Sequence, residues 1–110
     1  MGFVHNDLKP ENLVAGLDDP NRVYLIDFGL ASLWRDVDSN CHVSKKQLFV
    51  FQGNFKFATK NQCGGLRTSR RDDIQSTFFI LLFLLNVVKL PWMDQGGAEL
   101  LITNRIEWLA

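Results

Sequence analysis

The longest apolar stretch of the chain covers residues 78–85, in which eight apolar residues follow one another. Ser69 precedes this stretch, and Asp72 follows Ser69 by three positions, which is the spacing of a helix-capping pair. We therefore predict a helix that begins near Arg70 and continues to about residue 88. Because a helix that is apolar on every side is stable only when it is covered, we expect this helix to be buried.

This apolar stretch is too short to predict a membrane span. A helix needs about 20 apolar residues to cross the hydrocarbon core of a bilayer. Here the run is interrupted by Asn86 and ended by Lys89 and Pro91. A helix in the core of a domain is therefore the better interpretation, and we expect no membrane partner.

Two short β-prone segments lie earlier in the chain, at residues 12–14 and 23–26, and a turn rich in Gly, Asp and Pro separates them. Together they predict a β-hairpin. In this hairpin Asn12 stands at the start of the first strand and Asp27 follows the end of the second. We therefore expect these two residues to lie at the same edge of the hairpin.

The remaining segments have weaker patterns. Residues 30–57 combine low periodicity with several charges and one β-prone patch at residues 48–51. Within residues 96–110, apolar residues recur at intervals of four, four and three positions, which predicts a short amphipathic helix. The residues of that apolar face are Ala98, Ile102, Ile106 and Leu109.

Composition adds limits to this picture. The chain has 110 residues, of which 46% are hydrophobic, and its 12 basic residues balance its 12 acidic ones. These values are typical of one globular domain or a piece of one, and they do not suggest a nucleic-acid partner. Cys41 and Cys63 make no disulfide framework, and the N-terminus does not resemble a signal peptide. We therefore expect a cytoplasmic or nuclear protein.

Four polar residues around the predicted hairpin suggest a phosphoryl-transfer centre. Asp7 and Lys9 are two positions apart, so their side chains point to the same side of an extended chain. Asp7 can then accept a hydroxyl proton while Lys9 offers positive charge to a phosphate. Asn12 and Asp27 supply the oxygen ligands that Mg2+ prefers, and they leave room for phosphate oxygens and waters.

Two motifs in this region resemble those of protein kinases. Residues 5–12 read H-x-D-x-x-x-x-N, and residues 27–29 read D-F-G. Lys9, which is followed by Pro-Glu-Asn, resembles the serine/threonine form rather than the tyrosine form. The resemblance implies ATP and Mg2+ as cofactors and a protein hydroxyl as the substrate.

The resemblance also implies a role for each of the four polar residues. Asp7 would act as the base or orient the substrate hydroxyl, and Lys9 would stabilise the transferring phosphoryl group. Asn12 and Asp27 would bind Mg2+ and, through it, ATP. His5 is better interpreted as a buried histidine that holds the loop by hydrogen bonds.

Later residues resemble the casein kinase 1 family in particular. The A-P-E triplet of most kinases is absent from residues 53–61, residues 69–73 read S-R-R-D-D, and residues 90–92 read L-P-W. The resemblance covers roughly residues 2–93. It implies an α+β fold in which residues 1–110 are a partial kinase C-lobe, without the N-lobe and the terminal C-lobe helices. This C-lobe would hold a β-hairpin, an activation segment, one buried helix and one amphipathic helix.

Three residues at the start of the predicted helix have implied roles. Asp73 would hold the backbone of residues 5–12 by hydrogen bonds, and we call these residues the catalytic loop after the kinase segment that they resemble. Arg70 and Arg71 have two interpretations that the sequence leaves equally open. They could recognise a phosphate or an acidic group on the substrate, or they could anchor the helix by ion pairs with Asp72 and Asp73.

Control of the activity is suggested by residue 6. The arginine that usually precedes the catalytic aspartate pairs with a phosphorylated activation segment, and Asn6 stands in its place. This replacement argues against phosphorylation of that segment as the main switch. Ser39, Ser44 and Thr59 are candidate phosphorylation sites, which we interpret as ordinary solvated hydroxyl groups.

Two other functions are consistent with part of the sequence. Small-molecule kinases of the aminoglycoside and choline type share the H-x-D-x-x-x-x-N loop, but Lys9, Phe28 and residues 69–73 argue against them. A non-catalytic fragment that acts as an interaction module is the second alternative. Because ATP in a kinase is held between two lobes, we expect the 110-residue chain alone to be inactive. The partners that would bury the apolar helix of residues 78–88 in a complete lobe lie largely outside the chain, so we also expect a large exposed apolar patch and poor folding.

Overall fold

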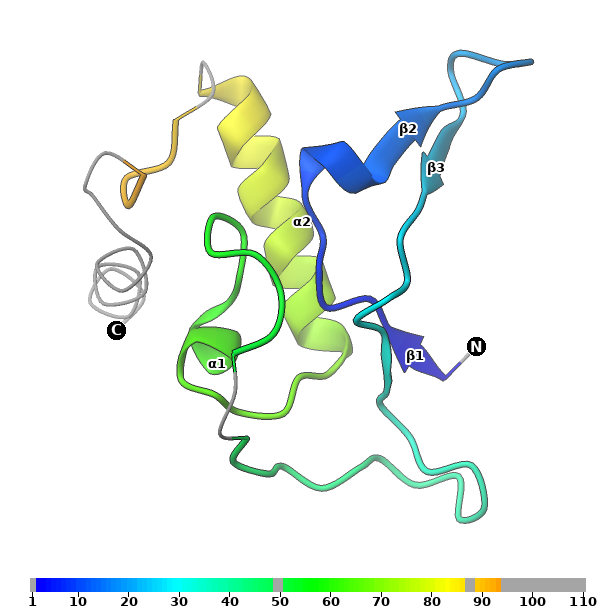
Figure 1. The fold of residues 1–110 in the computed structure, drawn as a ribbon, viewed down its shortest axis with the longest axis vertical. Coiled ribbons are helices and arrows are strands. Elements are labelled where there is room, and N and C mark those ends of the chain that lie inside the picture. The colour runs from blue at the N-terminus through cyan, green and yellow to red at the C-terminus, as the bar shows by residue number, and fades with distance from the viewer. Residues whose placement is uncertain (1, 49–50, 87–88, 94–110) are drawn as a thin grey trace.

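The computed structural model describes residues 2–48, 51–86 and 89–93 (Figure 1). These residues form a small α+β arrangement of two antiparallel two-stranded sheets and two α-helices. The elements in chain order are β1 (Phe3–Val4), the 3-10 turn η1 (Pro10–Asn12), β2 (Leu13–Ala15), β3 (Val23–Leu25), β4 (Ser32–Leu33), α1 (Lys60–Cys63) and α2 (Arg70–Leu85).

Helix α2 begins where the sequence predicts. Ser69 precedes it, and the Ser69 backbone N–H donates to the Asp72 carboxylate at 2.8 Å, so an otherwise unpaired helix-start donor is satisfied. The helix ends at Leu85, earlier than predicted, where the Asn86 backbone N–H bonds to the Leu82 carbonyl at 2.9 Å. Residues 87–88 lie outside the described residues.

Within the described residues α2 is buried on one side only, and its other side is the exposed apolar patch expected for this chain alone. Its buried stripe consists of Asp72, Ser76, Phe79 and Ile80. Other apolar side chains of the helix face outward, and Phe78 is 63% exposed and Leu85 82% exposed. The reason is that the described chain packs against one side of α2 only, so the same apolar run has a covered and an uncovered face.

The core lies on the covered side of α2, where the helix meets segments that precede it and follow it in the chain. Its buried members are Leu8, Phe57, Phe79, Ile80, Leu90 and Trp92. The rings of Phe79 and Trp92 meet edge to face with centroids 5.0 Å apart, and Trp92 Nε1 donates to the Lys56 carbonyl at 2.8 Å. The L-P-W segment therefore packs onto the buried side of α2.

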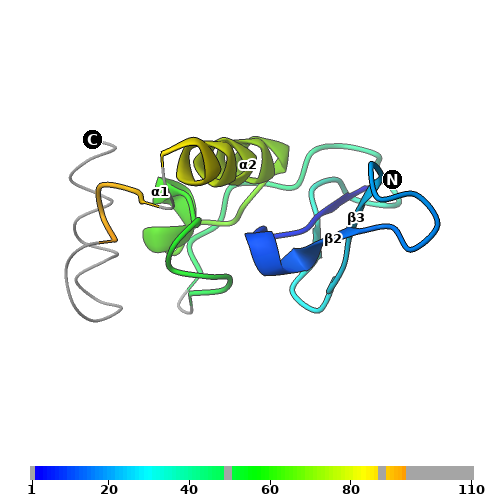
Figure 2. The same cartoon turned by 90° about the horizontal axis from the view of Figure 1, so that it is seen from above.

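The predicted hairpin is confirmed as β2 paired with β3. Leu13 pairs with Leu25 and Ala15 with Val23, while Asn12 belongs to the preceding 3-10 turn rather than to the strand. All six strand residues are exposed. Figures 1 and 2 show this hairpin projecting away from α2, with the chain segment before β2 running between them.

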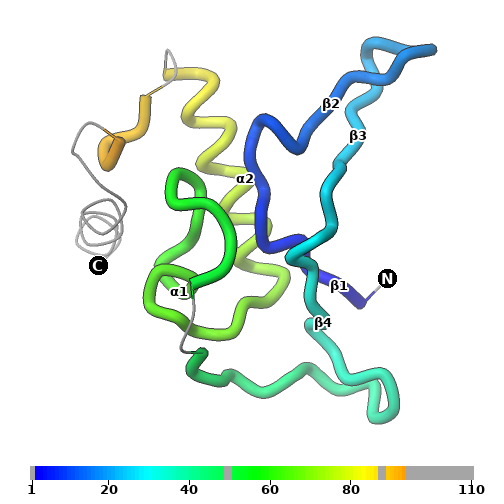
Figure 3. Tube along the Cα trace, viewed as in Figure 1, coloured from blue at the N-terminus to red at the C-terminus, as the bar shows by residue number. Residues whose placement is uncertain are grey.

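A second antiparallel strand pair, which the sequence did not suggest, joins β1 to β4, which are separated in the chain by β2 and β3. Phe3 pairs with Leu33 and Val4 with Ser32. The Trp34 backbone N–H extends the pairing by donating to the Gly2 carbonyl at 3.0 Å. Figure 3 shows that the chain continues from β4 along the lower edge of the molecule before it returns to α1.

Two predicted segments have other outcomes. The patch at residues 48–51 forms no strand in its described part, although the Leu48 backbone N–H donates to the Gly65 carbonyl at 2.6 Å. Residues 49–50 and the amphipathic helix predicted within residues 96–110 lie outside the described residues. Within the described ranges, no helix combines the length and apolar character needed to cross a bilayer.

Candidate active site

The catalytic loop is held in place by one carboxylate of helix α2. The backbone N–H groups of His5 and Asn6 donate to the two carboxylate oxygens of Asp73, at 2.6 and 3.0 Å. Hydrogen bonds to a charged group are stronger than neutral ones, and these two join residues 67 or more positions apart. The contact that the resemblance implies for Asp73 is therefore present in the structure.

His5 lies buried inside the loop and uses both ring nitrogens. The Asp7 backbone N–H donates to His5 Nδ1 at 3.2 Å, so Nδ1 carries no proton. His5 Nε2 must then carry the proton, and it donates to the Ile26 carbonyl at 3.0 Å. The ring also meets the Phe28 ring edge to face at 5.1 Å. This histidine thereby connects the catalytic loop to the D-F-G segment.

The Asp7 carboxylate lies among three donors from different parts of the chain. Lys9 Nζ is 3.2 Å from Asp7 Oδ2, Asn12 Nδ2 is 3.4 Å from the same oxygen, and Asn54 Nδ2 is 3.1 Å from Oδ1. The Asp7 and Lys9 side chains therefore meet, as their spacing predicts. A carboxylate held from both oxygens has little freedom to rotate, so these contacts favour one orientation of Asp7.

Asn54 is a site residue that the sequence reasoning missed. Its Nδ2 also donates to the Leu8 carbonyl at 3.0 Å, and its Oδ1 accepts the Phe57 backbone N–H at 2.7 Å. The last contact is a local turn that an Asn three positions before Phe57 could have suggested. The contact with Asp7 joins residues 47 positions apart and has no local signal.

Gly53, next to Asn54, allows this close approach. Its φ is +121°, and a Cβ at this position would lie 2.7 Å from the Asn6 carbonyl oxygen. Because that oxygen belongs to the backbone, it could not move aside without displacing the catalytic loop. A glycine is therefore required here for the segment after residue 52 to lie against the loop.

Asn12 and Asp27 occupy different environments at the same end of the hairpin. The Ile26 backbone N–H donates to the Asn12 carbonyl at 3.0 Å, which places Asp27 one residue beyond this pair. Asn12 is 4% exposed, and its Nδ2 donates to the Asp7 carbonyl at 2.9 Å. Asp27 is exposed and has a φ of 63°, and its Oδ1 accepts the Gly29 backbone N–H at 3.2 Å.

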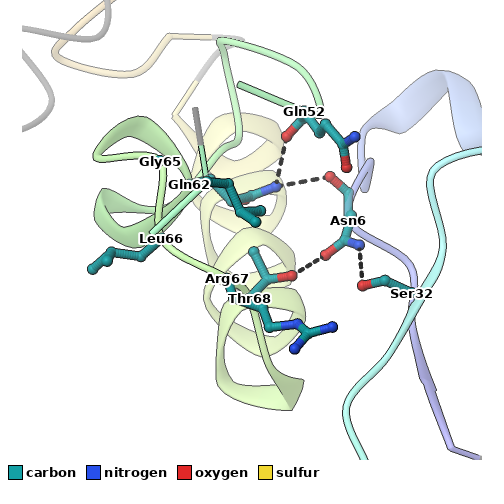
Figure 4. A pocket seen from close by; sticks show the side chains of 9 residues that line it. Asn6, Ser32, Gln52, Gln62, Gly65, Leu66, Arg67 and Thr68 are labelled. Atoms are coloured by element: carbon teal, nitrogen blue, oxygen red, sulfur yellow. Dashed lines mark hydrogen bonds between the residues drawn. The ribbon is translucent and has the colours of Figure 1, made fainter. Parts of the chain in front are cut away.

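Asn6 is buried at the centre of a hydrogen-bond network (Figure 4). Its Nδ2 donates to the Leu30 carbonyl at 2.9 Å and to Ser32 Oγ at 2.8 Å, while its Oδ1 accepts from Thr68 Oγ1. Its carbonyl accepts from Gln62 Nε2 at 2.8 Å. Asn6 thus ties the catalytic loop to β4 and to the chain before α2 through neutral groups.

Asn6 also tolerates the backbone that this position needs. Its φ of 71° lies in the left-handed region, which asparagine and glycine adopt more readily than other residues. The network surrounds a cavity of about 210 Å³. The cavity is lined by Asn6, Ser32, Leu48, Gln52, Gln62, Gly65, Leu66, Arg67 and Thr68.

Thr59 and Asp72 form a second buried network. Thr59 is 0% exposed, so its interpretation as a solvated hydroxyl is wrong. It caps α1 in a capping box with Gln62, and its Oγ1 donates to Asp72 Oδ1 at 2.7 Å. Asn61 Nδ2 donates to the same oxygen at 3.1 Å. The hydroxyl that the sequence offered as a phosphorylation site therefore joins the starts of two helices.

The structure places Arg70 and Arg71 in different positions. The Arg70 guanidinium carbon lies 3.7 Å from the centroid of the Trp34 ring, which is a cation–π contact. Arg71 Nε is 3.7 Å from Asp72 Oδ2, within ion-pair range but long for a hydrogen bond. Whether either arginine binds substrate stays a prediction.

Comparison with known proteins agrees with these motifs. No protein-family model matches the chain. The chain is 41% identical over 100 residues to "Casein kinase 1-like protein HD16" of Oryza sativa subsp. japonica. This match covers 87% of the chain and 14% of that relative, so the chain spans a small part of the relative's length. The chain is thus a relative of the casein kinase 1-like protein kinases and corresponds to part of such a protein.

Proposed function

We propose that this chain carries the phosphoryl-transfer residues of a serine/threonine protein kinase. The observation that supports the proposal most strongly is the setting of Asp7. Its carboxylate is held by Lys9, Asn12 and Asn54, and the loop that bears it is held by Asp73. An arrangement that fixes one carboxylate from two directions is what orientation of an attacking hydroxyl group requires.

Each residue then has a definite task. Asp7 accepts a hydrogen bond from the serine or threonine hydroxyl of the protein substrate and takes up its proton as the oxygen attacks. Lys9, one third exposed and next to Asp7, offers positive charge to the transferring phosphoryl group of ATP. Asn12 keeps the loop in register by its bond to the Asp7 carbonyl.

The residues proposed to bind Mg2+ fit that ion. Asn12 donates through Nδ2 and is buried, yet its Oδ1 has no hydrogen-bond partner among the described residues. Asp27 is exposed and adds a carboxylate at the same end of the hairpin. Within residues 2–48, 51–86 and 89–93 no group of three His, Cys, Asp or Glu residues could hold a metal. One carboxylate and one amide oxygen suit Mg2+, which neutralises phosphate charge and takes its other ligands from phosphate and water.

Asn6 supports a proposal about control. A neutral side chain with partners from β4 and from Thr68 already holds the loop against the segment that precedes α2. Asn6 is neutral, so it does not need a phosphate partner as an arginine at this position would. We therefore expect the kinase to be active without phosphorylation of the activation segment, which a rate assay before and after phosphatase treatment would measure.

The test of the proposed chemistry is the substitution Asp7→Asn in a protein in which an ATP-binding lobe and the remaining helices complete this chain. Loss of the proton acceptor is expected to lower kcat by about 10²–10⁴-fold. Asp19→Asn is the matched control, because Asp19 makes a similar carboxylate contact, to the Asn21 N–H, in an exposed turn. Unchanged kcat in Asp7→Asn would remove Asp7 from the mechanism.

A non-catalytic role of the isolated chain is the second candidate, and the uncovered side of α2 favours it. Phe78, Leu81, Leu82 and Leu85 are all about half exposed or more. Such a surface promotes association with other proteins or with further copies of the chain. We expect the isolated chain to self-associate and to bind MgATP more weakly than micromolar.

Calorimetry with MgATP, together with the size of the chain in solution, tests this expectation. The double substitution Phe78→Ser and Leu82→Ser should reduce self-association while leaving the buried side of α2 unchanged. A soluble monomer that binds MgATP at micromolar concentration would show that the chain needs no further lobe.

A further inference from the structure

A pocket of positive character lies where the chain after β4 passes the start of α2. Its volume is about 120 Å³. It is lined by His42, Val43, Ser44, Lys45, Arg67, Thr68, Ser69 and Arg71, and we call it the basic pocket. Three of these eight described residues are basic, namely Lys45, Arg67 and Arg71, and none has a carboxylate. Cations around one small space are the groups that bind a phosphate.

The nearest described carboxylate to Arg71 neutralises it only in part. Asp72 Oδ2 is 3.7 Å from Arg71 Nε and already accepts the Ser69 backbone N–H at 2.8 Å. The Asp72 side chain is 2% exposed, whereas the Arg71 side chain is 60% exposed. The outer part of the Arg71 guanidinium is therefore available to a ligand. The pocket is a local excess of positive charge in a chain whose formal net charge is zero.

The backbone holds Ser44 at this pocket from both sides. Before it, the Val43 N–H donates to the Trp34 carbonyl at 2.9 Å. After it, the Lys46 carbonyl accepts the Arg67 N–H at 2.8 Å, which fixes the serine segment beside one of the pocket cations. Ser44 itself is exposed and lies outside regular secondary structure, as accessible phosphorylation sites do.

We propose that Ser44 is a phosphorylation site and that its phosphate binds in the basic pocket of the same chain. In the transfer, Ser44 Oγ forms a bond to the γ-phosphorus of a nucleoside triphosphate bound to a protein kinase. The bond from that phosphorus to the bridging oxygen breaks, the diphosphate leaves, and the hydroxyl proton passes to the base of the kinase. The resulting phosphate, with a charge of about −2, meets Lys45, Arg67 and Arg71.

The phosphate would fasten residues 42–45 to the start of α2 without replacing the contacts of the catalytic loop. Thr68 lines the basic pocket, but its hydroxyl donates to Asn6 and so completes the neutral network separately. Phosphorylation of Ser44 would thus stabilise the contact between residues 42–45 and the start of α2, and activity would not require it. The proposal goes beyond the proposed function and does not depend on catalysis by this chain.

Protection from a phosphatase tests the proposal at nanomolar concentrations, where association is slow. The 110-residue chain would carry genetically encoded phosphoserine at position 44 or, as a matched control, at position 39. Ser39 lies in the same segment, but both its N–H and its hydroxyl bond to the Asp36 carboxylate, so its surroundings are acidic. We expect dephosphorylation at Ser44 to be about tenfold slower than at Ser39, the effect of one charge-assisted hydrogen bond or more.

Variants of the pocket sharpen the test. The change Arg67→Gln with Arg71→Gln should remove the protection at Ser44 and leave the Ser39 rate unchanged, while Arg67→Lys with Arg71→Lys should keep part of it. Equal rates at the two serines in the unsubstituted chain would overturn the proposal, even if a variant failed to fold. Inorganic phosphate that binds to a Ser44→Ala chain while phosphorylated Ser44 stays unprotected would assign the pocket to an external anion, and would also overturn it.

Discussion

The catalytic loop and the β2–β3 hairpin are neighbours in sequence, but they differ in burial. In the loop, residues 5–8 are all buried, and most of them are polar. In the hairpin, every strand residue is exposed, although most are apolar. Polar residues can be buried in the loop because each finds a partner, such as Asp73 for the backbone of His5 and Asn6.

This difference separates the two halves of the candidate site. Asp7 is oriented by contacts that the described chain provides, so its geometry does not depend on a further domain. Asp27 follows a two-stranded hairpin whose strand residues are all exposed, and an isolated hairpin of two strands is marginally stable in water. We infer that the half around Asp7, proposed to orient the hydroxyl, is organised in advance, and that the half proposed to bind Mg2+ depends on neighbours for its rigidity.

Among the substitutions that test the difference between the catalytic loop and the hairpin, Asp73→Asn is expected to have the largest effect on stability. The substitution replaces a charged acceptor of two backbone hydrogen bonds by a neutral amide, which leaves a buried donor poorly satisfied and costs about 3 kcal/mol. Hydrogen exchange at the His5 and Asn6 amides should become much faster, while exchange at the Gly16 amide of the hairpin should hardly change. If the two loop amides kept their protection, the loop would be held by something other than Asp73.

A smaller effect is expected from Asn6→Gly, which keeps the left-handed backbone and removes the side-chain bonds to Leu30, Ser32 and Thr68. Loss of these buried bonds should lower the free energy of unfolding by about 2 kcal/mol. Asn40→Gly is the matched control, because Asn40 also has a positive φ, of 55°, but is exposed. Its change should stay within about 0.5 kcal/mol in the same urea titration. Equal changes in the two variants would attribute the effect to the backbone alone.

The smallest effect concerns Asp36, an exposed carboxylate with only local contacts. The Ser39 backbone N–H and hydroxyl donate to it and lower the pKa of Asp36 below its ordinary value. Because the folded pKa is lowered, its contribution to the turn is present above the pKa of the unfolded chain and is lost as the pH falls through the folded pKa. NMR titration should show a lowered Asp36 pKa that returns toward normal in Ser39→Ala. A pKa that does not respond to Ser39→Ala would assign the shift to another group.

Local sequence signals predicted the positions of helices and strands better than they predicted which side chains are buried. The capping pair of Ser69 and Asp72 correctly predicted where α2 starts, and the turn after Ala15 correctly predicted the hairpin. The interpretation of Thr59 as a solvated hydroxyl was wrong, because Thr59 is buried. Burial depends on which segments pack against an element, and a pattern within the element does not contain that information.

The sequence by itself determined the order of the motifs, the start of α2 and the meeting of Asp7 with Lys9, because capping, turns and side-chain alternation act over a few residues. Only the tertiary structure decided that Asn54 contacts Asp7, that Asn6 joins β4 to Thr68, and that the cations around Ser44 form one pocket. These contacts join residues far apart in the chain, so they exist only once packing has brought the segments together.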